Sequence, residues 1–492
     1  MIRWIGVAGA ILLFAWLATA NSGGYRYGVS DQAFYSASVL RSIDPSLYPK
    51  DTPLLEVQSR LMWSDEIIAG LARMTSIDLP GLYFLLYLVT LASLLAAAVA
   101  FGRAARFSAW AIALLAILLT FRHRIAKTGA NSLEGYMHPR MLAFALGVAA
   151  LAATLRGRFG WAVAATIASF VWHPTTAVWF GIVVLAAACF DTRWRRPAIV
   201  AVALTAAAGA LAVFAGPLAG RLVTMDRDWL AVLGDKDYLF PTDWPAYAWI
   251  TNLAYPCVIV ALYRRRVRRG DTVPGERAFI NGLLILTAVF LVSVPFTAAR
   301  IALAVQSQST RVFWVLDVVA IAYLAWWLTT DVARARTARL AVVGLFLAFS
   351  IGRGVYQLTA GDGGRELVRV DYPATPWMDA MRWLETQPAS WHVLADPGHA
   401  WKYGVSARLA ARKDTVLESG KDSALAMYDR AIAMRVAERT AALGSYPDMT
   451  TDHLRQLDAR YAIDVAVVEA PLARHPFPEL FRNAQFVIYD LR

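Results

Sequence analysis

The first residue that could do chemistry is Asp31, in the stretch Gly28-Val29-Ser30-Asp31-Gln32 that follows the first apolar segment. A carboxylate beside a membrane surface can act as a general base and take a proton from a hydroxyl group. Asp31 could instead cap the helix expected over Gln32–Leu40, because Asp is a favoured N-cap residue. The sequence alone leaves both interpretations open.

A second set of side chains is basic and could bind phosphate, because guanidinium groups pair with phosphate oxygens through two parallel hydrogen bonds. The candidates are Arg122, Arg124, Lys127, His138, Arg140, His173, Arg300 and Arg311. Several of them have an alternative interpretation. Pro139 suits the first turn of a helix and Arg140 could extend to the membrane surface. His173-Pro174 could end a helix, and Arg300 and Arg311 could be interfacial anchors.

Helices that cross a membrane must position these residues. Hydrophobic residues make up 58% of the 492 residues and charged residues 17%, against about 45–50% and about 25% in soluble domains. This composition excludes a soluble single-core protein and predicts a mainly α-helical polytopic membrane protein with about eleven spans. The expected spans are residues 4–20, 80–102, 107–121, 141–155, 161–172, 175–190, 197–215, 247–263, 278–299, 311–330 and 340–357.

The distribution of arginines predicts the orientation of these spans. Every second loop is rich in arginine, and together these loops carry 17 Lys and Arg against four acids, which places them in the cytoplasm with the N-terminus. The apolar run Trp161–Phe190 is too long for one crossing and is expected to form a hairpin with His173-Pro174 near its turn. Residues 1–20 could alternatively be a cleaved signal peptide; residues 21–79 are extracytoplasmic in either case.

We therefore expect two domains. Residues 1–357 form the transmembrane domain with a long first extracytoplasmic loop (21–79), and residues 358–492 form a small extracytoplasmic α/β domain. In that second domain, the patterns predict helices over Thr375–Glu385 and Ser423–Leu443, and strands over 392–395, 463–468 and 485–489.

Several function classes are excluded by what the sequence contains. The net charge of +12 comes almost wholly from the cytoplasmic arginines, so it is a signal of topology and not of a nucleic-acid partner. The sequence shows no zinc-ligand spacing, glycine-rich phosphate loop or serine-hydrolase motif. Asp317 lies inside a predicted span, where a carboxylate is costly and requires a partner or a function.

The layout of the whole chain resembles the GT-C superfamily of integral-membrane glycosyltransferases, which use polyprenyl-phosphate-linked sugars. Asp31 matches the position of the catalytic acid in the first loop of that family. Many members carry two adjacent acids or a metal-binding set, whereas Gln32 follows Asp31 here, which puts dependence on a divalent metal in doubt. The loops with HPR and WHP also resemble a group of uncharacterised bacterial membrane proteins.

The resemblance implies transfer of a sugar from a polyprenyl-phosphate donor to a glycan, lipid or protein acceptor, at the outer face of a bacterial cytoplasmic membrane. Asp31 would be the base and the basic residues would hold the phosphate. No cofactor is expected, and the sequence leaves a divalent metal open without supporting it. A non-catalytic membrane protein, such as an exporter of lipid or polysaccharide or an envelope-assembly scaffold, would explain the same layout.

Overall fold

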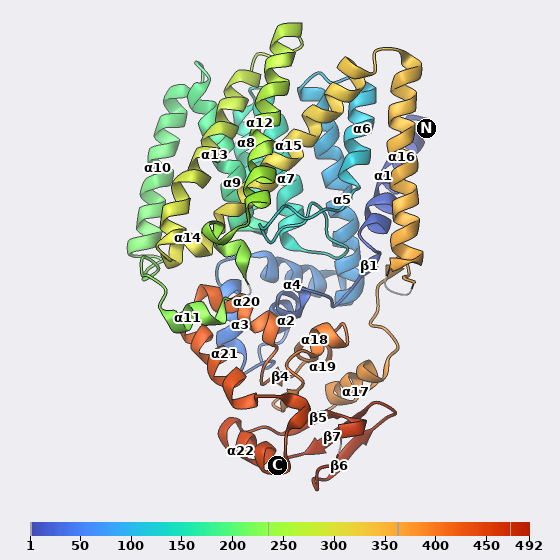
Figure 1. Ribbon diagram of the computed structural model, residues 1–492, viewed down its shortest axis with the longest axis vertical. Coiled ribbons are helices and arrows are strands. Elements are labelled where there is room, and N and C mark those ends of the chain that lie inside the picture. The colour runs from blue at the N-terminus through green and yellow to red at the C-terminus, as the bar shows by residue number, and fades with distance from the viewer. Residues whose placement is uncertain (1, 235, 362–363, 473) are drawn as a thin grey trace. The chain divides into compact units, whose positions relative to one another are not determined.

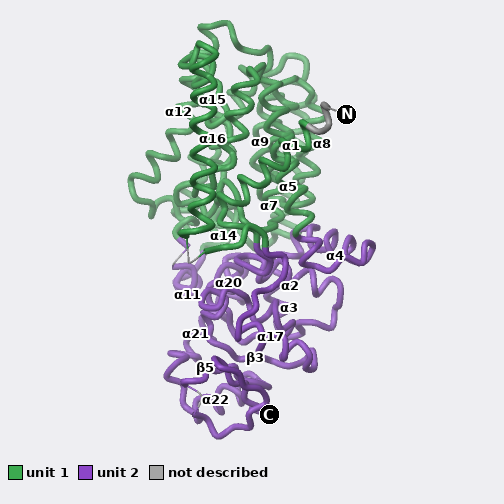
Figure 2. The backbone as a smooth tube through the Cα atoms, turned by 90° about the vertical axis from the view of Figure 1, so that its right-hand side faces the viewer, with its two compact units in different colours: residues 1–25, 84–224, 237–368 green, residues 26–83, 225–236, 369–492 purple. Residues whose placement is uncertain are grey.

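The computed structural model describes residues 2–234, 236–361, 364–472 and 474–492 (Figure 1). The chain forms two compact units, each assembled from three separate segments (Figure 2). Unit 1 comprises residues 1–25, 84–224 and 237–368, and unit 2 comprises residues 26–83, 225–236 and 369–492. The first long loop and the C-terminal part of the chain therefore belong to one unit.

Unit 1 consists of apolar helices. They are α1 (Ile2–Asn21), α5 (Leu79–Ala104), α6 (Ala109–Leu119), α7 (Pro139–Leu155), α8 (Phe159–Trp172), α9 (Pro174–Phe190), α10 (Arg195–Phe214), α12 (Ala246–Arg269), α13 (Glu276–Ala298), α14 (Ala302–Ser307), α15 (Val312–Trp326) and α16 (Arg336–Thr359). In the described residues, six helical segments are long and apolar enough to cross a membrane. Five further apolar helices have 10–17 residues. Each of the predicted spans falls on one of these helices.

Large apolar side chains cover the outside of α10 and α16. Leu211 and Phe214 on α10 are 66% and 75% exposed, and Leu345 and Phe349 on α16 are 68% and 62% exposed. Contiguous apolar surface of this kind is rare on soluble monomers and marks an interaction surface. Lipid chains can cover it, which supports a membrane protein.

The hairpin predicted over Trp161–Phe190 is confirmed. Helix α8 ends at Trp172 and α9 begins at Pro174, with His173 in extended conformation between them. Proline suits the first turn of a helix because its missing N–H has no intrahelical partner there. The His-Pro pair thus stops one helix and starts the next.

Close packing holds the helices of unit 1 together. A Cβ atom on Gly147 of α7 would lie 2.2 Å from Phe180 of α9, so only glycine permits this approach. Phe144 of α7 stacks on Trp314 of α15 with ring centroids 4.0 Å apart. These contacts bring the N-terminal ends of α7, α9 and α15 into one region.

Unit 2 mixes helices with a small sheet. Its helices are α2 (Gln32–Ile43), α3 (Thr52–Ser59), α4 (Ser64–Thr75), α11 (Arg227–Val232), α17 (Pro376–Glu385), α18 (His399–Lys402), α19 (Ala407–Ala411), α20 (Ser419–Leu425), α21 (Arg430–Leu443) and α22 (Thr451–Tyr461). The five strands are β3 (His392–Ala395), β4 (Asp414–Thr415), β5 (Val465–Glu469), β6 (Glu479–Arg482) and β7 (Phe486–Asp490), in the order β4-β3-β5-β7-β6. Strand β3 runs parallel to β4 and β5, and β7 runs antiparallel to β5 and β6. The short strands β1 (Tyr25–Arg26) and β2 (Val368–Arg369) form a separate two-stranded sheet.

The single helix predicted over Ser423–Leu443 is wrong. Helix α20 ends at Leu425, and α21 begins at Arg430 after a short 3₁₀ turn. Asp429 stands between them in extended conformation, and its carboxylate accepts a hydrogen bond from the amide of Ala431 at 2.7 Å. Asp competes for backbone amides in this way and starts helices more readily than it continues them. The helix predicted over Thr375–Glu385 is confirmed as α17.

Candidate functional site

Asp31 lies at the start of α2 in unit 2, but its side chain makes no capping hydrogen bond to that helix. The side chain of the neighbouring Gln32 closes the turn that precedes the helix, because its Oε1 accepts a hydrogen bond from the amide of Gly28 at 2.7 Å. Gly28 has φ +78°, and a Cβ atom there would lie 2.5 Å from the Tyr372 ring. The turn therefore requires glycine at this position.

The Asp31 carboxylate forms an ion pair with Lys421 of α20, with Nζ 3.3 Å from Oδ1. The Lys421 side chain is 7% exposed and that of Asp31 is 29% exposed, so the acid stays accessible while its partner is buried. The Lys421 ammonium also lies 5.0 Å from the centre of the Trp401 ring. Lys421 holds the carboxylate and Trp401 contacts the ammonium group of Lys421; neither residue was identified from the sequence.

In unit 1, the loop between α6 and α7 contains a buried ion pair. Glu134 is 3% exposed and forms a short contact with Arg140, and Arg122 lies 3.7 Å from its other oxygen. Arg353 of α16 donates hydrogen bonds to the carbonyl of Arg122 at 2.8 Å and to Asn21. Glu134 thus brings two of the predicted phosphate-binding arginines together and neutralises one positive charge.

His138 and His173 have matching local roles. His138 is the N-cap of α7 and its Nδ1 accepts the amide of Arg140 at 3.2 Å. His173 is the N-cap of α9 and its Nδ1 accepts the amide of Thr176 at 3.3 Å. Because Nδ1 accepts in both rings, a neutral ring carries its proton on Nε2. Both histidines therefore cap helices and also present an Nε2–H donor.

These side chains meet at the positive ends of three helices. The rings of His138 and His173 are 6.3 Å apart, and Arg140 and Arg311 lie close enough to His173 for their charges to act on it. Arg311 is the N-cap residue of α15. Helix N-termini carry about half a positive charge each and bind anions. We call His138, Arg140, His173 and Arg311 the basic cluster.

The other predicted basic residues lie elsewhere in unit 1. Lys127 forms an ion pair with Asp237. Arg300 pairs with Asp243 at 3.1 Å and stacks on Phe240 with its guanidinium carbon 4.1 Å from the ring centre. Arg124 is exposed, and its backbone pairs with that of Asn131. The structure thus joins four of the eight residues in the basic cluster and links Arg122 to it through Glu134.

The carboxylate of Asp317, within α15, pairs with His123. Nε2 of His123 lies 3.1 Å and 3.2 Å from the two carboxylate oxygens, and its Nδ1 donates to the carbonyl of Phe121 at 3.0 Å. Burial lowers the pKa of His123, but the hydrogen bond and charge of Asp317 outweigh it, so this pKa is raised. The pair offsets the cost of placing a carboxylate in a span.

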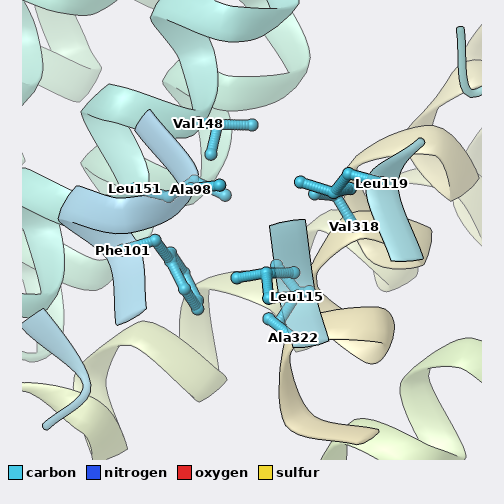
Figure 3. A pocket seen from close by; sticks show the side chains of 9 residues that line it. Ala98, Phe101, Leu115, Leu119, Val148, Leu151, Val318 and Ala322 are labelled. Atoms are coloured by element: carbon cyan, nitrogen blue, oxygen red, sulfur yellow. The ribbon is translucent and has the colours of Figure 1, made fainter. Parts of the chain in front are cut away.

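An apolar pocket lies between α5, α6, α7 and α15 in unit 1 (Figure 3). Phe101, Leu115, Leu151 and Val318 are among the side chains that surround it. Its cavity measures about 10 Å³, roughly the space of one water molecule. It is a packing defect of the helical core and has no room for a prenyl chain as it stands.

A buried ionic network joins the first loop to the C-terminal segment within unit 2. Arg408 is 0% exposed and pairs with Asp51 at 2.7 Å, Asp422 at 2.9 Å and Glu418 at 3.3 Å. Asp51 also pairs with Arg435. Despite burial, the arginines hold the pKa of Asp51 well below its ordinary value. The network fixes the loop that carries Asp31 to the rest of unit 2.

Among the described residues, no group of three or more His, Cys, Asp or Glu side chains could hold a metal ion. The side chain of Gln32, the residue beside Asp31, is directed to the amide of Gly28.

Comparisons with known proteins concern the fold alone. No protein-family model matches the chain, and no curated protein matches it. Among solved structures, the chain is similar to the archaeal oligosaccharyltransferase AglB from Archaeoglobus fulgidus in complex with an inhibitory peptide and a dolichol-phosphate, with a TM-score of 0.49, 11% identity, and coverage of 95% of this chain and 70% of that chain. It is also similar to an Archaeoglobus fulgidus oligosaccharyltransferase with zinc and sulfate, with a TM-score of 0.41, 12% identity and coverage of 94% and 68%. A third similar structure is the Archaeoglobus fulgidus oligosaccharyltransferase tethered to an acceptor peptide that contains the NVT sequon. Its TM-score is 0.46 and its identity 11%, and the match covers 94% of this chain and 69% of that chain.

Proposed function

We propose that the chain is a membrane glycosyltransferase that moves a sugar from a polyprenyl-phosphate donor to a hydroxyl or amide acceptor on the extracytoplasmic face of a bacterial cytoplasmic membrane. One observation carries the proposal, namely that unit 1 gathers the basic cluster at the N-termini of α7, α9 and α15. A phosphate matches this environment because arginines, imidazole N–H groups and helix N-termini all favour an anion.

The reaction needs two kinds of help from the protein. The bond between the sugar and the phosphate breaks, so negative charge develops on the departing lipid phosphate, and Arg140 and Arg311 would stabilise it. The Nε2–H groups of His138 and His173 would orient its oxygens. The acceptor loses a proton as its new bond to the sugar forms, and Asp31 would take that proton.

Unit 2 contributes a carboxylate suited to this role. Asp31 is accessible, is not used as a helix cap, and is held by Lys421. Removal of a general base typically slows a reaction by about 10²–10⁴-fold. Lys421 acts through Asp31 and would be a positioning residue.

The test uses purified full-length protein and a short-chain polyprenyl phosphate, with the matching polyprenol as the control ligand. We expect the phosphate to bind and the polyprenol to bind at least about tenfold more weakly, since charge-assisted hydrogen bonds each contribute about 1.5–3 kcal/mol. R140Q and R311Q should weaken phosphate binding. R300Q should not, because the structure pairs Arg300 with Asp243 outside the cluster.

A transfer assay with the corresponding lipid-phosphate sugar tests Asp31 separately. D31N should lose transfer and keep binding of the polyprenyl phosphate. Equal binding of phosphate and polyprenol would reject the basic cluster as a phosphate site. Full transfer by correctly folded D31N would reject Asp31 as the base.

A further inference from the structure

A cavity of about 330 Å³ lies at the arginine-rich end of unit 1, at the opposite end of α6 from the loop that carries Arg122. The lining comes from the turn between α5 and α6, the turn after α12, and the end of α15 together with the π-helix η4 (Trp327–Val332) that continues it. The lining residues are Arg106, Ser108, Gly270, Asp271, Thr272, Trp326 and Thr330. Its volume is in the usual range for small-ligand pockets.

A buried arginine clamps the walls of this cavity. Arg266 is 0% exposed, and its Nη2 donates to the carbonyl of Ala105 at 2.8 Å and to that of Asp271 at 2.7 Å. Glu276 holds the same guanidinium through a hydrogen bond of 2.6 Å. The guanidinium also lies 4.9 Å from the centre of the Trp326 ring, which lines the cavity. The two turns are therefore fixed relative to each other, and the cavity is a built feature of the fold.

The cavity carries an uncompensated positive charge. Asp271 is neutralised by Arg269 at 2.9 Å, and Asp331 by Arg265 at 2.6 Å. In the described part of the chain, the exposed Arg106 guanidinium forms no ion pair. The N-terminus of α6 adds its positive dipole end directly after Ser108.

Two local irregularities mark the same place. Arg106 has φ +55°, a left-handed conformation in which glycine is favoured over arginine. Thr330 lies on a π-helix, a rare conformation that is frequently found at functional positions. Glycine would adopt the backbone conformation of Arg106 with less strain, so the presence of arginine at this position indicates a function for its side chain.

We infer that this cavity binds the phosphate group of an anionic phospholipid headgroup. Basic pockets between transmembrane helices on the cytoplasmic side of a membrane bind such headgroups, and the arginine distribution predicts that this end is cytoplasmic. Arg106 pairs with the phosphate, and the hydroxyl groups of Thr272 and Thr330 provide further polar contacts. The site does not depend on the proposed transferase activity.

The experiment measures thermal unfolding of the full-length protein in a zwitterionic detergent while one ligand is titrated. The ligands are short-chain phosphatidylglycerol, the matching phosphatidylcholine, and inorganic phosphate. Phosphatidylglycerol should raise the unfolding midpoint of the wild type, and R106Q and R106G should weaken its apparent affinity at least about tenfold. T330F keeps every charge and should weaken the response by filling the cavity.

Matched variants separate binding from folding. R106G relieves the left-handed strain, so its lipid-free midpoint should equal or exceed that of the wild type. R196Q removes an exposed arginine of α10 outside the cavity and should keep the full response. An undiminished response in R106G, or an equal response to phosphatidylcholine, would overturn the inference. An equal response to inorganic phosphate would overturn the assignment to a lipid.

Discussion

Replacement of Arg408 by leucine tests whether the buried network holds unit 2 together. Three carboxylates surround this fully buried guanidinium, at 2.7 Å for Asp51, 2.9 Å for Asp422 and 3.3 Å for Glu418. The variant removes the shared cation and leaves the acids in place. The loss is therefore set by how many carboxylates keep another partner.

The remaining contacts give the expected magnitude. Asp51 keeps Arg435 and the amide of Thr415. Glu418 keeps His399 at 3.0 Å and the hydroxyl of Ser406 at 2.5 Å. Asp422 loses its arginine and keeps the amide of Glu418. One orphaned charge costs about 3–5 kcal/mol, which lowers the midpoint of a unit of this size by about 6–20 °C.

Thermal unfolding of full-length R408L in detergent, monitored by tryptophan fluorescence, measures this loss. Burial already raises the pKa of Asp422, since it outweighs Arg408 and acts together with the charge of Glu418. Without Arg408 the charged form is penalised further, and this penalty disappears on protonation. The deficit of R408L should therefore shrink as the pH falls from 8 towards 5.

The double variant R408L/D422L provides the control. It removes the orphaned charge along with the arginine, and apolar replacement of a buried pair is often close to neutral. It should recover at least half of the loss. A single variant that loses less than about 1 kcal/mol, or a double variant no more stable than the single, would refute the reasoning.

Two further predictions concern other positions. Burial, together with the neighbouring charge of Asp51, raises the pKa of Asp414 to about 6. The charged form of this acid therefore costs stability at neutral pH, by up to about 3 kcal/mol. D414N keeps an acceptor for the amides of Lys50 and Asp51, so it should be at least as stable as the wild type at pH 7.5, with the difference vanishing below about pH 4 in unfolding scans. G147A should lower the unfolding midpoint by the equivalent of about 1–3 kcal/mol, because its methyl group would meet Phe180. G209A on α10, which has open space around it, should leave the midpoint unchanged or raise it; equal effects of the two variants would contradict this packing argument.

Local patterns in the sequence predict the helices of unit 1 well. Each apolar run predicted as a span falls on a helix of unit 1, because a membrane-crossing segment must be apolar along its whole length. The His173-Pro174 pair predicts the break between α8 and α9, since proline begins a helix more easily than it continues one. Such features depend on neighbouring residues and can be recognised without the fold.

Partners distant in the sequence could not be predicted in the same way. Asp31 is paired with Lys421, 390 residues further along the chain, and Asp317 with His123, 194 residues away. No local pattern relates these residues, because the fold alone brings them together. The sequence left open whether Asp31 caps α2, and in the structure its side chain makes no capping hydrogen bond.

The shared unit of the first loop and the C-terminal segment has a consequence for biosynthesis. Residues 26–83 leave the ribosome long before residues 369–492, with which they form unit 2. At about 5–20 residues per second, the loop waits roughly 16–65 s for Arg408, the cation that compensates Asp51. A nascent chain must therefore keep this loop without its partners until synthesis is almost finished, and a chain truncated after α16 could not complete unit 2.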